Sequence, residues 1–227
     1  ICCGFAIPVS QHFGAKNTLK MKEAIFHAGF LSILFAAVIT TACAILCPNI
    51  LHILSTPENI FDDAYSYLFI IFLGIPFTIL YNFLSGLLRA VGDSKTPFLF
   101  LVFSSILNII LDLTFIIVFK LGVSGAALAT IMSQGVSGLL CLIYIIKKFP
   151  ILCISKEHCR IKSDMTKQMI AMGVPMGLQY SITAIGSMVM QSANNGLGST
   201  YISGFTAGMR TVSYTHLRAH ETPEHLV

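Results

Sequence analysis

The residues from Pro97 to Phe119, PFLFLVFSSILNIILDLTFIIVF, constrain the fold of this chain more than any other stretch. They form an apolar segment of 23 residues that carries a single charge, Asp112. At a rise of about 1.5 Å per residue, a helix of this length crosses a hydrocarbon core of about 30 Å. The sequence therefore predicts a transmembrane helix with one carboxylate inside the membrane.

This acid belongs to a polar stripe. A spacing of three to four residues places the polar side chains of the segment on one face of a helix: Ser104, Ser105, Asn108 and Asp112. A charged side chain at the bilayer centre costs about 2.5–3.5 kcal/mol on insertion scales, so an intramembrane acid is a candidate functional residue by default. The simpler alternative is that Asp112 only hydrogen-bonds a neighbouring helix.

The composition extends the prediction to the whole chain. Hydrophobic residues make up 55% of the sequence, charged residues 11%, and the mean hydropathy is +0.81, which together indicate an all-α polytopic membrane protein. We expect Pro48 to end the first complete span, Ser55–Glu58 to cap the next helix, and Gly74 and Pro76 to interrupt the second span. The other complete spans are predicted at Ala24–Cys47, Ala64–Leu88, 125–146 and Ile170–Asn194. A turn is expected at Gly196–Thr200, and a further helix starts within Tyr201–Arg210.

The longest polar connection is Lys147–Lys167. At its end Met165, Met169 and Met172 repeat at helical spacing, which fits either an amphipathic segment at the membrane interface or an extension of the next helix. Basic residues concentrate in alternate loops, so the positive-inside rule places these loops in the cytoplasm. They are Lys16, Lys20, Lys22, Arg89, Lys95, Lys147, Lys148, Lys156, Arg160, Lys162 and Lys167, whereas the intervening connections hold only Lys120.

Other polar residues within the spans are candidates for a substrate cavity. Thr130, Ser133, Gln134 and Ser137 share one face of the span that ends at Ile146. The cavity candidates are Asn82, Ser85, Gln134, Gln179 and Thr183. The abundant Phe and Met residues suit a promiscuous apolar pocket, although such residues are more often core or lipid contacts.

Several functional classes find no support in the sequence. Cys153 and Cys159 lack a matching His or Cys pair at zinc spacing, so we assign no metal site. His27 and His52 lie near span ends with no obvious catalytic partner, so we predict that the protein is not an enzyme. There is no nucleotide-binding motif, so ATP is not the expected energy source, and we expect no nucleic-acid partner and no organic cofactor.

Several motifs at matching spacing closely resemble the multidrug and toxic compound extrusion (MATE) family. They are LSGLLRAVGDSKTPF (Leu84–Phe98), LNIILDLTFI (Leu107–Ile116), GVSGAALAT (Gly122–Thr130), SQHFGAKN (Ser10–Asn17) and GVPMGLQ (Gly173–Gln179). The resemblance implies a fragment of a twelve-helix, two-lobe bundle that contains the end of helix 2, helices 3–7 and the start of helix 8. Residues 1–146 would then form part of the amino-terminal lobe, residues 147–167 a cytoplasmic inter-lobe linker, and residues 168–210 the start of the carboxy-terminal lobe.

The resemblance also implies a function. Family members exchange entry of H⁺ or Na⁺ for export of amphipathic, often cationic, compounds. In the prokaryotic branch that this chain most resembles, an acid on helix 1 joins an Asn and an Asp on helix 5 and a Thr on helix 6. The last three match Asn108, Asp112 and Thr130, which could bind a proton or Na⁺, whereas the segment that would hold the helix 1 acid lies before residue 1. Another branch carries an acid in helix 7, and the matching position near Thr183 holds none.

The expected protein is thus a multi-pass transporter of the bacterial inner membrane that acts as a monomer when full length. Two alternatives stay open: a lipid-linked oligosaccharide flippase of the same superfamily, which would lack the Asn108–Asp112 pair and carry more cationic residues in its cavity, and a non-transporting membrane protein. Val212–Thr222, VSYTHLRAHET, resembles one reading frame of a transposase sequencing-library adapter. Residues 211–227 are therefore expected to be a non-native tail without a functional role.

Overall fold

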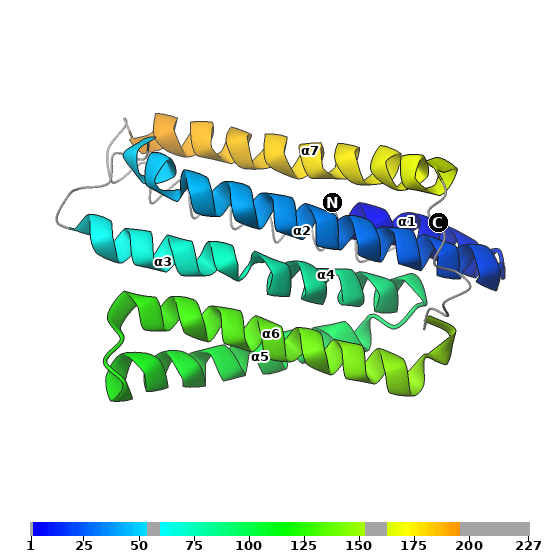
Figure 1. The fold of residues 1–227 in the computed structure, drawn as a ribbon, viewed down its shortest axis with the longest axis horizontal. Coiled ribbons are helices and arrows are strands. Elements are labelled where there is room, and N and C mark those ends of the chain that lie inside the picture. The colour runs from blue at the N-terminus through cyan, green and yellow to red at the C-terminus, as the bar shows by residue number, and fades with distance from the viewer. Residues whose placement is uncertain (1, 54–59, 153–162, 196–227) are drawn as a thin grey trace, which may run out of the picture. The chain divides into compact units, whose positions relative to one another are not determined.

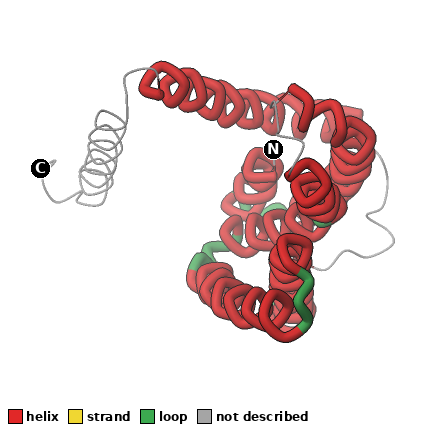
Figure 2. The backbone as a smooth tube through the Cα atoms, turned by 90° about the vertical axis from the view of Figure 1, so that its left-hand side faces the viewer, coloured by secondary structure: helices red, strands yellow, loops and turns green. Residues whose placement is uncertain are grey.

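The computed structural model describes residues 2–53, 60–152 and 163–195, in which every regular element is helical (Figures 1 and 2). The chain divides into two compact units, Ile1–Met176 and Gly177–Val227. The elements are α1 (Cys2–Gly14), α2 (Thr18–Ile53), α3 (Phe61–Leu73), α4 (Ile75–Ala90), α5 (Lys95–Leu113), the π-helical turn η2 (Thr114–Val118), α6 (Gly122–Lys148), the short 3-10 turn η3 (Pro150–Leu152) and α7 (Ser163–Asn195).

Within the first unit the helices follow one another in space. Helices α1 and α2 pack together, the pair α3–α4 lies between α2 and α6, and α5 lies alongside α6 (Figure 1). Helix α5 packs mainly on α6, and Pro97 and Ser104 are its only buried residues. Most of the surface of α5 is therefore free to face lipid.

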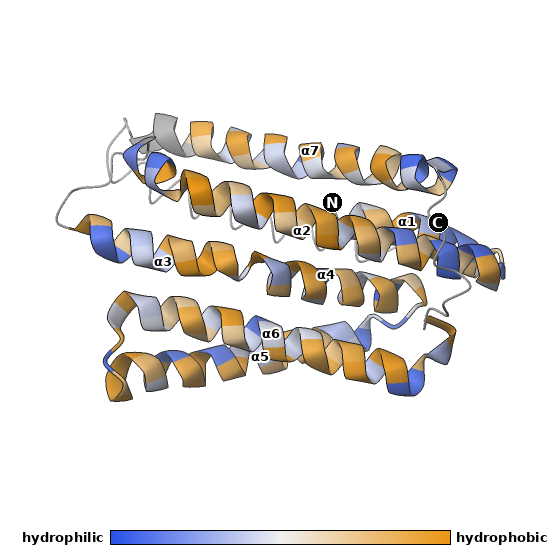
Figure 3. Cartoon of the chain, viewed as in Figure 1, coloured by the Kyte–Doolittle hydropathy of each residue, from blue (hydrophilic) through white to orange (hydrophobic). Residues whose placement is uncertain are grey.

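The predicted membrane spans are confirmed for the described residues. Five helical segments are long and apolar enough to cross a bilayer: Thr18–His52, Phe61–Ala90, Lys95–Val118, Gly122–Lys148 and Ser163–Met190. Each contains or overlaps one of the complete spans expected from the sequence. Figure 3 shows hydrophobic residues along these helices, with hydrophilic residues gathered at several of their ends. The chain is a multi-pass, all-helical membrane protein.

Of the two helix breaks predicted from proline and glycine, the structure shows the one at Gly74 and not the one at Pro48. The expectation that the first span ends at Pro48 is wrong, because α2 continues through Pro48 to Ile53. Ending a helix inside a membrane would leave backbone groups without partners, so the chain tolerates the proline instead. The predicted interruption of the second span is confirmed, since α3 ends at Leu73 and α4 begins at Ile75, with Gly74 between them.

The two interpretations of the methionine repeat are resolved in favour of a helix extension. Helix α7 begins at Ser163, and Met169 is fully buried in the core of the first unit with Met165 packed against that core. A Cβ atom on Gly4 would lie 2.7 Å from the backbone of Gly173, so α1 and the start of α7 approach closely there. Met169 thus packs in a helix interface and does not lie at a lipid surface.

Some expectations fall outside the described residues. These are the cap at Ser55–Glu58, the turn at Gly196–Thr200, the helix at Tyr201–Arg210, the tail at residues 211–227, and the loop residues Cys153, Lys156, Cys159, Arg160 and Lys162.

Candidate functional site

The polar stripes predicted on α5 and α6 face each other along an antiparallel helix pair. The Ser137 hydroxyl donates to the Phe100 carbonyl at 3.3 Å, and the Asn108 amide donates to the Thr130 hydroxyl at 3.4 Å. The two contacts fit one antiparallel register, because the residue number rises from Phe100 to Asn108 along α5 while it falls from Ser137 to Thr130 along α6. The interface between two apolar helices is therefore polar for much of its length.

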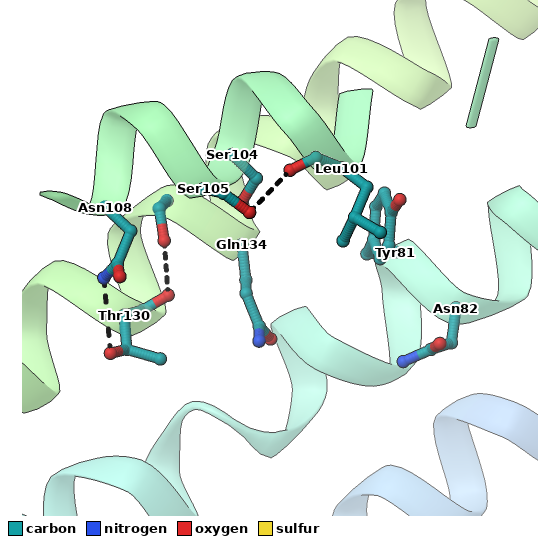
Figure 4. A pocket seen from close by; sticks show the side chains of 9 residues that line it. Tyr81, Asn82, Leu101, Ser104, Ser105, Asn108, Thr130 and Gln134 are labelled. Carbon is teal, nitrogen blue, oxygen red and sulfur yellow. Dashed lines mark hydrogen bonds between the residues drawn. The ribbon is translucent and has the colours of Figure 1, made fainter. Parts of the chain in front are cut away.

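Asn108 and Thr130 are in contact, as Figure 4 shows. Thr130 also donates its hydroxyl hydrogen to the Ala126 carbonyl at 3.0 Å, which leaves its oxygen lone pairs available to accept. The Asn108–Thr130 bond is long for a hydrogen bond. Both side chains also carry hard oxygen atoms of the kind that bind Na⁺ or accept from a protonated acid.

Asp112 lies one helical turn beyond Asn108 on α5. Its Oδ1 atom is buried and has no hydrogen-bond partner among the described residues. A buried acceptor without a partner costs about 1–3 kcal/mol, more if it is charged. The π-helical turn η2 begins two residues later, with the Phe119 amide bonded to the Thr114 carbonyl at 3.1 Å. Such turns recur at functional sites in helices.

A polar cavity of about 300 Å³ opens between α4, α5 and α6 (Figure 4). Asn108 and Thr130 line one part of it, and Asp112 is not among its lining residues. Its lining in the described part of the chain carries no charged side chain. The lining residues are Tyr81, Asn82, Leu101, Ser104, Ser105, Asn108, Thr130, Ser133 and Gln134.

Helix α4, which follows the break in the α3–α4 span, contributes Tyr81 and Asn82 to the lining of this cavity. The Thr78 hydroxyl, one turn beyond Gly74, forms a short hydrogen bond to the Gln134 side-chain oxygen on α6. The Asn82 amide donates to the Thr78 carbonyl at 2.8 Å, which ties the next turn of α4 to the same network. The helix interruption therefore brings polar groups of α4 against α6.

The other cavity candidates lie elsewhere. Ser85 is buried in the first unit and does not line the cavity, whereas Asn82 and Gln134 do. Gln179 and Thr183 belong to the second unit, where both are exposed on α7 and the Thr183 hydroxyl donates to the Gln179 carbonyl at 2.9 Å. Among the described residues no group of three or more His, Cys, Asp or Glu side chains could hold a metal ion.

Sequence reasoning missed Tyr81 and Leu101 of the cavity lining, and it missed Thr78, which bonds to the lining residue Gln134. Thr78 has a detectable signal, because it precedes Asn82 by one helical turn and follows the Gly74–Pro76 break. Tyr81 gives no such signal. In the structure its hydroxyl donates to the Pro97 carbonyl at 2.9 Å and joins α4 to the start of α5.

Comparison with known proteins identifies relatives of this chain. Residues 1–114 match the family model described as MatE. The chain is 41% identical over 171 residues to a probable multidrug resistance protein, YpnP, of Bacillus subtilis (strain 168), covering 75% of this chain and 38% of the relative. It is 26% identical over 209 residues to the multidrug export protein MepA of Staphylococcus saprophyticus, covering 92% of this chain and 46% of the relative.

Solved structures share the fold. An outward-facing multidrug resistance MATE family transporter of the MOP superfamily matches with a TM-score of 0.84 at 23% identity, covering 94% of this chain and 48% of that chain. An inward-facing one matches with a TM-score of 0.79 at 23% identity, covering 92% and 48%. The chain thus spans about half the length, or less, of the relatives it matches. With the family-model match over residues 1–114, these findings show that the chain belongs to the MatE family.

Proposed function

We propose that the protein is a cation-coupled antiporter that exports amphipathic, often cationic, drugs or metabolites across the cytoplasmic membrane of a bacterium. The observation that carries this proposal is the buried Asp112 oxygen, which has no partner among the described residues and lies within a helix that also presents Asn108 to Thr130. The names of the relatives, multidrug resistance and multidrug export proteins, support the export of drugs.

In this mechanism the coupling ion, H⁺ or Na⁺, binds at Asp112 with help from the oxygens of Asn108 and Thr130. Binding gives the buried Oδ1 atom of Asp112 a partner, so it favours the arrangement of α5 and α6 that encloses the ion. A change in the packing of α5 then drives the switch from the outward-facing to the inward-facing state. The ion must bind the two states with different affinity, because only that difference can shift their populations.

The polar cavity next to this pair is the proposed meeting point of ion and substrate. Neutral oxygen and nitrogen groups from Asn82, Ser104 and Gln134 can orient a cationic compound without binding it as tightly as a fixed charge would. A flippase is expected to carry cationic side chains in its cavity, and the described lining of this cavity contains neither Lys nor Arg. The lining therefore supports the antiporter more than the flippase.

We further propose the lobe boundaries given by the family resemblance, residues 1–146 and 168–210 with a linker at 147–167. We also propose that the protein works as a monomer.

The test is export from proteoliposomes that contain the complete gene product, driven by an imposed proton or sodium gradient. We expect Asp112→Asn to lower gradient-driven export about 100-fold while the protein still folds and binds drug. The control is Ser181→Ala, because Ser181 is exposed on α7, does not line the cavity, and its hydroxyl donates to the Gly177 carbonyl of its own helix at 3.0 Å. Export by Asp112→Asn at the rate of the control would disprove the proposal.

A further inference from the structure

A second polar cluster joins α5 to α6 at the opposite end of α5 from Asp112. The Thr96 hydroxyl donates to Oδ2 of Asp93 at 2.7 Å, and the Tyr144 hydroxyl donates to the same oxygen at 3.4 Å. The Thr96 and Tyr144 hydroxyl oxygens also lie 3.2 Å apart. These three residues, called the Tyr144 clamp below, connect the turn before α5 to the last two turns of α6.

The local sequence builds the clamp from two capping motifs. Gly92 has a φ of 91°, and the amides of Gly92 and Asp93 bond to the carbonyls of Arg89 and Leu88, which ends α4 in a Schellman motif. The next residue along, Asp93, lies one residue before the N-cap Ser94 and accepts the Thr96 amide at 3.1 Å, so it supplies the capping acceptor for the first turn of α5. A side chain at Gly92 would strain this turn, so the glycine fixes where Asp93 is presented to Tyr144.

The Tyr144 ring is held on several sides. Its centroid lies 5.9 Å from that of Phe100 in an edge-to-face arrangement and 6.0 Å from that of Phe149. The Lys148 ammonium lies 5.4 Å from the Tyr144 ring centroid, within the range of a cation–π contact. Ring packing and hydroxyl bonding therefore act on the same side chain, and they can be separated by removing the hydroxyl alone.

The two ends of the α5–α6 pair are held differently. At the clamp, Asp93 accepts three bonds from two residues, whereas at the far end the Asn108–Thr130 bond is 3.4 Å long and Oδ1 of Asp112 is unpaired in the described part of the chain. Beyond Asp112 the α-helical bonding gives way to η2. The clamped end of α5 is therefore fixed by a hydrogen-bonded network, whereas the Asp112 end has hydrogen-bonding groups that are not satisfied within the described residues.

We propose that the Tyr144 clamp is the fixed pivot of α5, so that ion binding at Asp112 displaces the far end of the helix while its clamped end keeps its register on α6. This inference rests on the proposed function, because the pivot matters only if Asp112 is where the coupling ion binds. Tyr144, Thr96 and Asp93 are positioning residues in this account, since none of them contacts the ion. Without the clamp, α5 could slide or tilt as a whole, and ion binding would be converted less efficiently into the switch.

The pivot predicts a specific kinetic signature. Tyr144→Phe removes the hydroxyl and keeps the ring packing, and Thr96→Val removes the second hydroxyl at nearly constant volume. Each should lower the maximal rate of driven export about threefold to tenfold, the range expected for losing one or two hydrogen bonds, while drug affinity stays within about twofold. Thr96→Ser keeps the hydroxyl and should export like the wild type.

Tyr65→Phe is the matched control for Tyr144→Phe. Tyr65 lies on α3, its ring stacks on Phe69 at 5.7 Å, and no hydrogen bond of its hydroxyl is found within the described residues. The same atom is deleted from the same residue type in a membrane helix, so a general effect of losing a tyrosine hydroxyl would appear in both variants. We expect Tyr65→Phe to leave the maximal rate unchanged.

The direct test measures distances in the complete gene product by electron–electron resonance between pairs of spin-labelled unnatural residues. One pair, at the exposed positions Phe98 and Ile143, reports on the clamped end, and a second pair, at the exposed positions Ile109 and Leu128, reports on the Asp112 end. Samples are compared in acidic and alkaline buffer, each with and without sodium chloride. We expect the ion to shift the Ile109–Leu128 distance only, and we expect Tyr144→Phe and Thr96→Val to broaden the Phe98–Ile143 distance.

The outcomes separate this inference from the proposed function. An ion-dependent shift of the Phe98–Ile143 distance as large as that of the other pair would overturn the pivot, as would wild-type export by both Tyr144→Phe and Thr96→Val. If Tyr144→Phe does not fold, Thr96→Val and the wild-type distances still decide. Loss of export in Asp112→Asn with normal export in both clamp variants would refute the pivot alone, whereas normal export in Asp112→Asn would refute the proposed function first.

Discussion

Asp93 and Asp112 stand at opposite ends of α5, and their surroundings differ in a way that separates a structural carboxylate from a candidate coupling carboxylate. Asp93 accepts bonds from the Thr96 amide, the Thr96 hydroxyl and the Tyr144 hydroxyl. Asp112 has a buried oxygen that accepts none within the described chain. The first acid has already gained its stabilising partners on folding, whereas the second can still gain them from an ion.

This contrast shows that the hydrogen bonds that a carboxylate lacks indicate its capacity to bind an ion better than its charge does. A carboxylate with all its acceptors satisfied gains nothing from binding a cation that would displace its donors. A buried carboxylate without partners gains both charge compensation and hydrogen bonds. Removal of the carboxylate should therefore stabilise the fold at Asp112 and destabilise it at Asp93.

The largest expected effect is on stability at Asp112. Asp112→Leu removes a buried, unsatisfied acceptor and should raise the free energy of unfolding by about 1–3 kcal/mol, at the cost of driven export. The measurement is chemical or thermal unfolding of the purified complete protein in detergent. A clear loss of stability would mean that Asp112 has partners in the native state, and the contrast with Asp93 would fail.

The next effect is at Asp93. Asp93→Ala removes the cap of α5 and the acceptor of the Tyr144 clamp, so we expect a loss of about 1–2 kcal/mol in the free energy of unfolding. Asp93→Asn should retain most of that stability, because Asn is also a favourable cap residue. The same unfolding assay checks both variants, and equal losses from Ala and Asn would show that the charge and not the cap is what matters.

A smaller effect is expected at Asn108. Asn108→Ala removes one oxygen ligand and the bond to Thr130, so the affinity for the coupling ion should weaken about twofold to tenfold. Raising the ion concentration by the same factor should restore export. Ser181→Ala, at an exposed position on α7 outside the cavity lining, is the control. Export that stays low at saturating ion would show that Asn108 acts on the conformational change instead.

The smallest effect is the pH dependence of stability from Asp93. Partial burial raises the pKa of Asp93, but the hydrogen bonds from Thr96 and Tyr144 and the nearby Lys148 charge outweigh it and hold the pKa below its ordinary value of 3.8. Because the folded pKa is the lower one, the stabilisation is present above pH 3.8 and is lost as the pH falls through the folded pKa. Stability curves of the wild type and Asp93→Asn should therefore converge in acid, and a constant gap would contradict this account.

Much of the fold follows from the sequence, and the reason is the length of the apolar runs. The span from Pro97 to Phe119 and the interruption at Gly74 were both predictable, because the bilayer sets helix length and glycine next to proline disrupts a helix. At Pro48 the expectation from proline alone is wrong, because the same bilayer also penalises a helix that stops inside it, and α2 continues to Ile53. The π-helical turn η2 left no signal, since its sequence TFIIV is an ordinary apolar run.

The candidate site was only partly predictable. The spacing of Asn108 and Asp112 places them on one helix face, but periodicity alone cannot show that Thr130 on another helix lies opposite Asn108. The Tyr144 clamp was not foreseen for the same reason, because Tyr144 sits among apolar residues, 51 positions from Asp93. Contacts between distant segments depend on helix register, which only the folded chain displays.

The most direct test of the central claim is a measurement of cation binding. Proton release and ²²Na⁺ binding would be compared for the wild type, Asp112→Asn and Asp93→Asn in the complete gene product, as purified protein without any gradient. We expect wild-type ion binding in Asp93→Asn and its loss in Asp112→Asn. Retained binding in Asp112→Asn, or loss of binding in Asp93→Asn, would contradict the assignment of Asp112 as the coupling carboxylate.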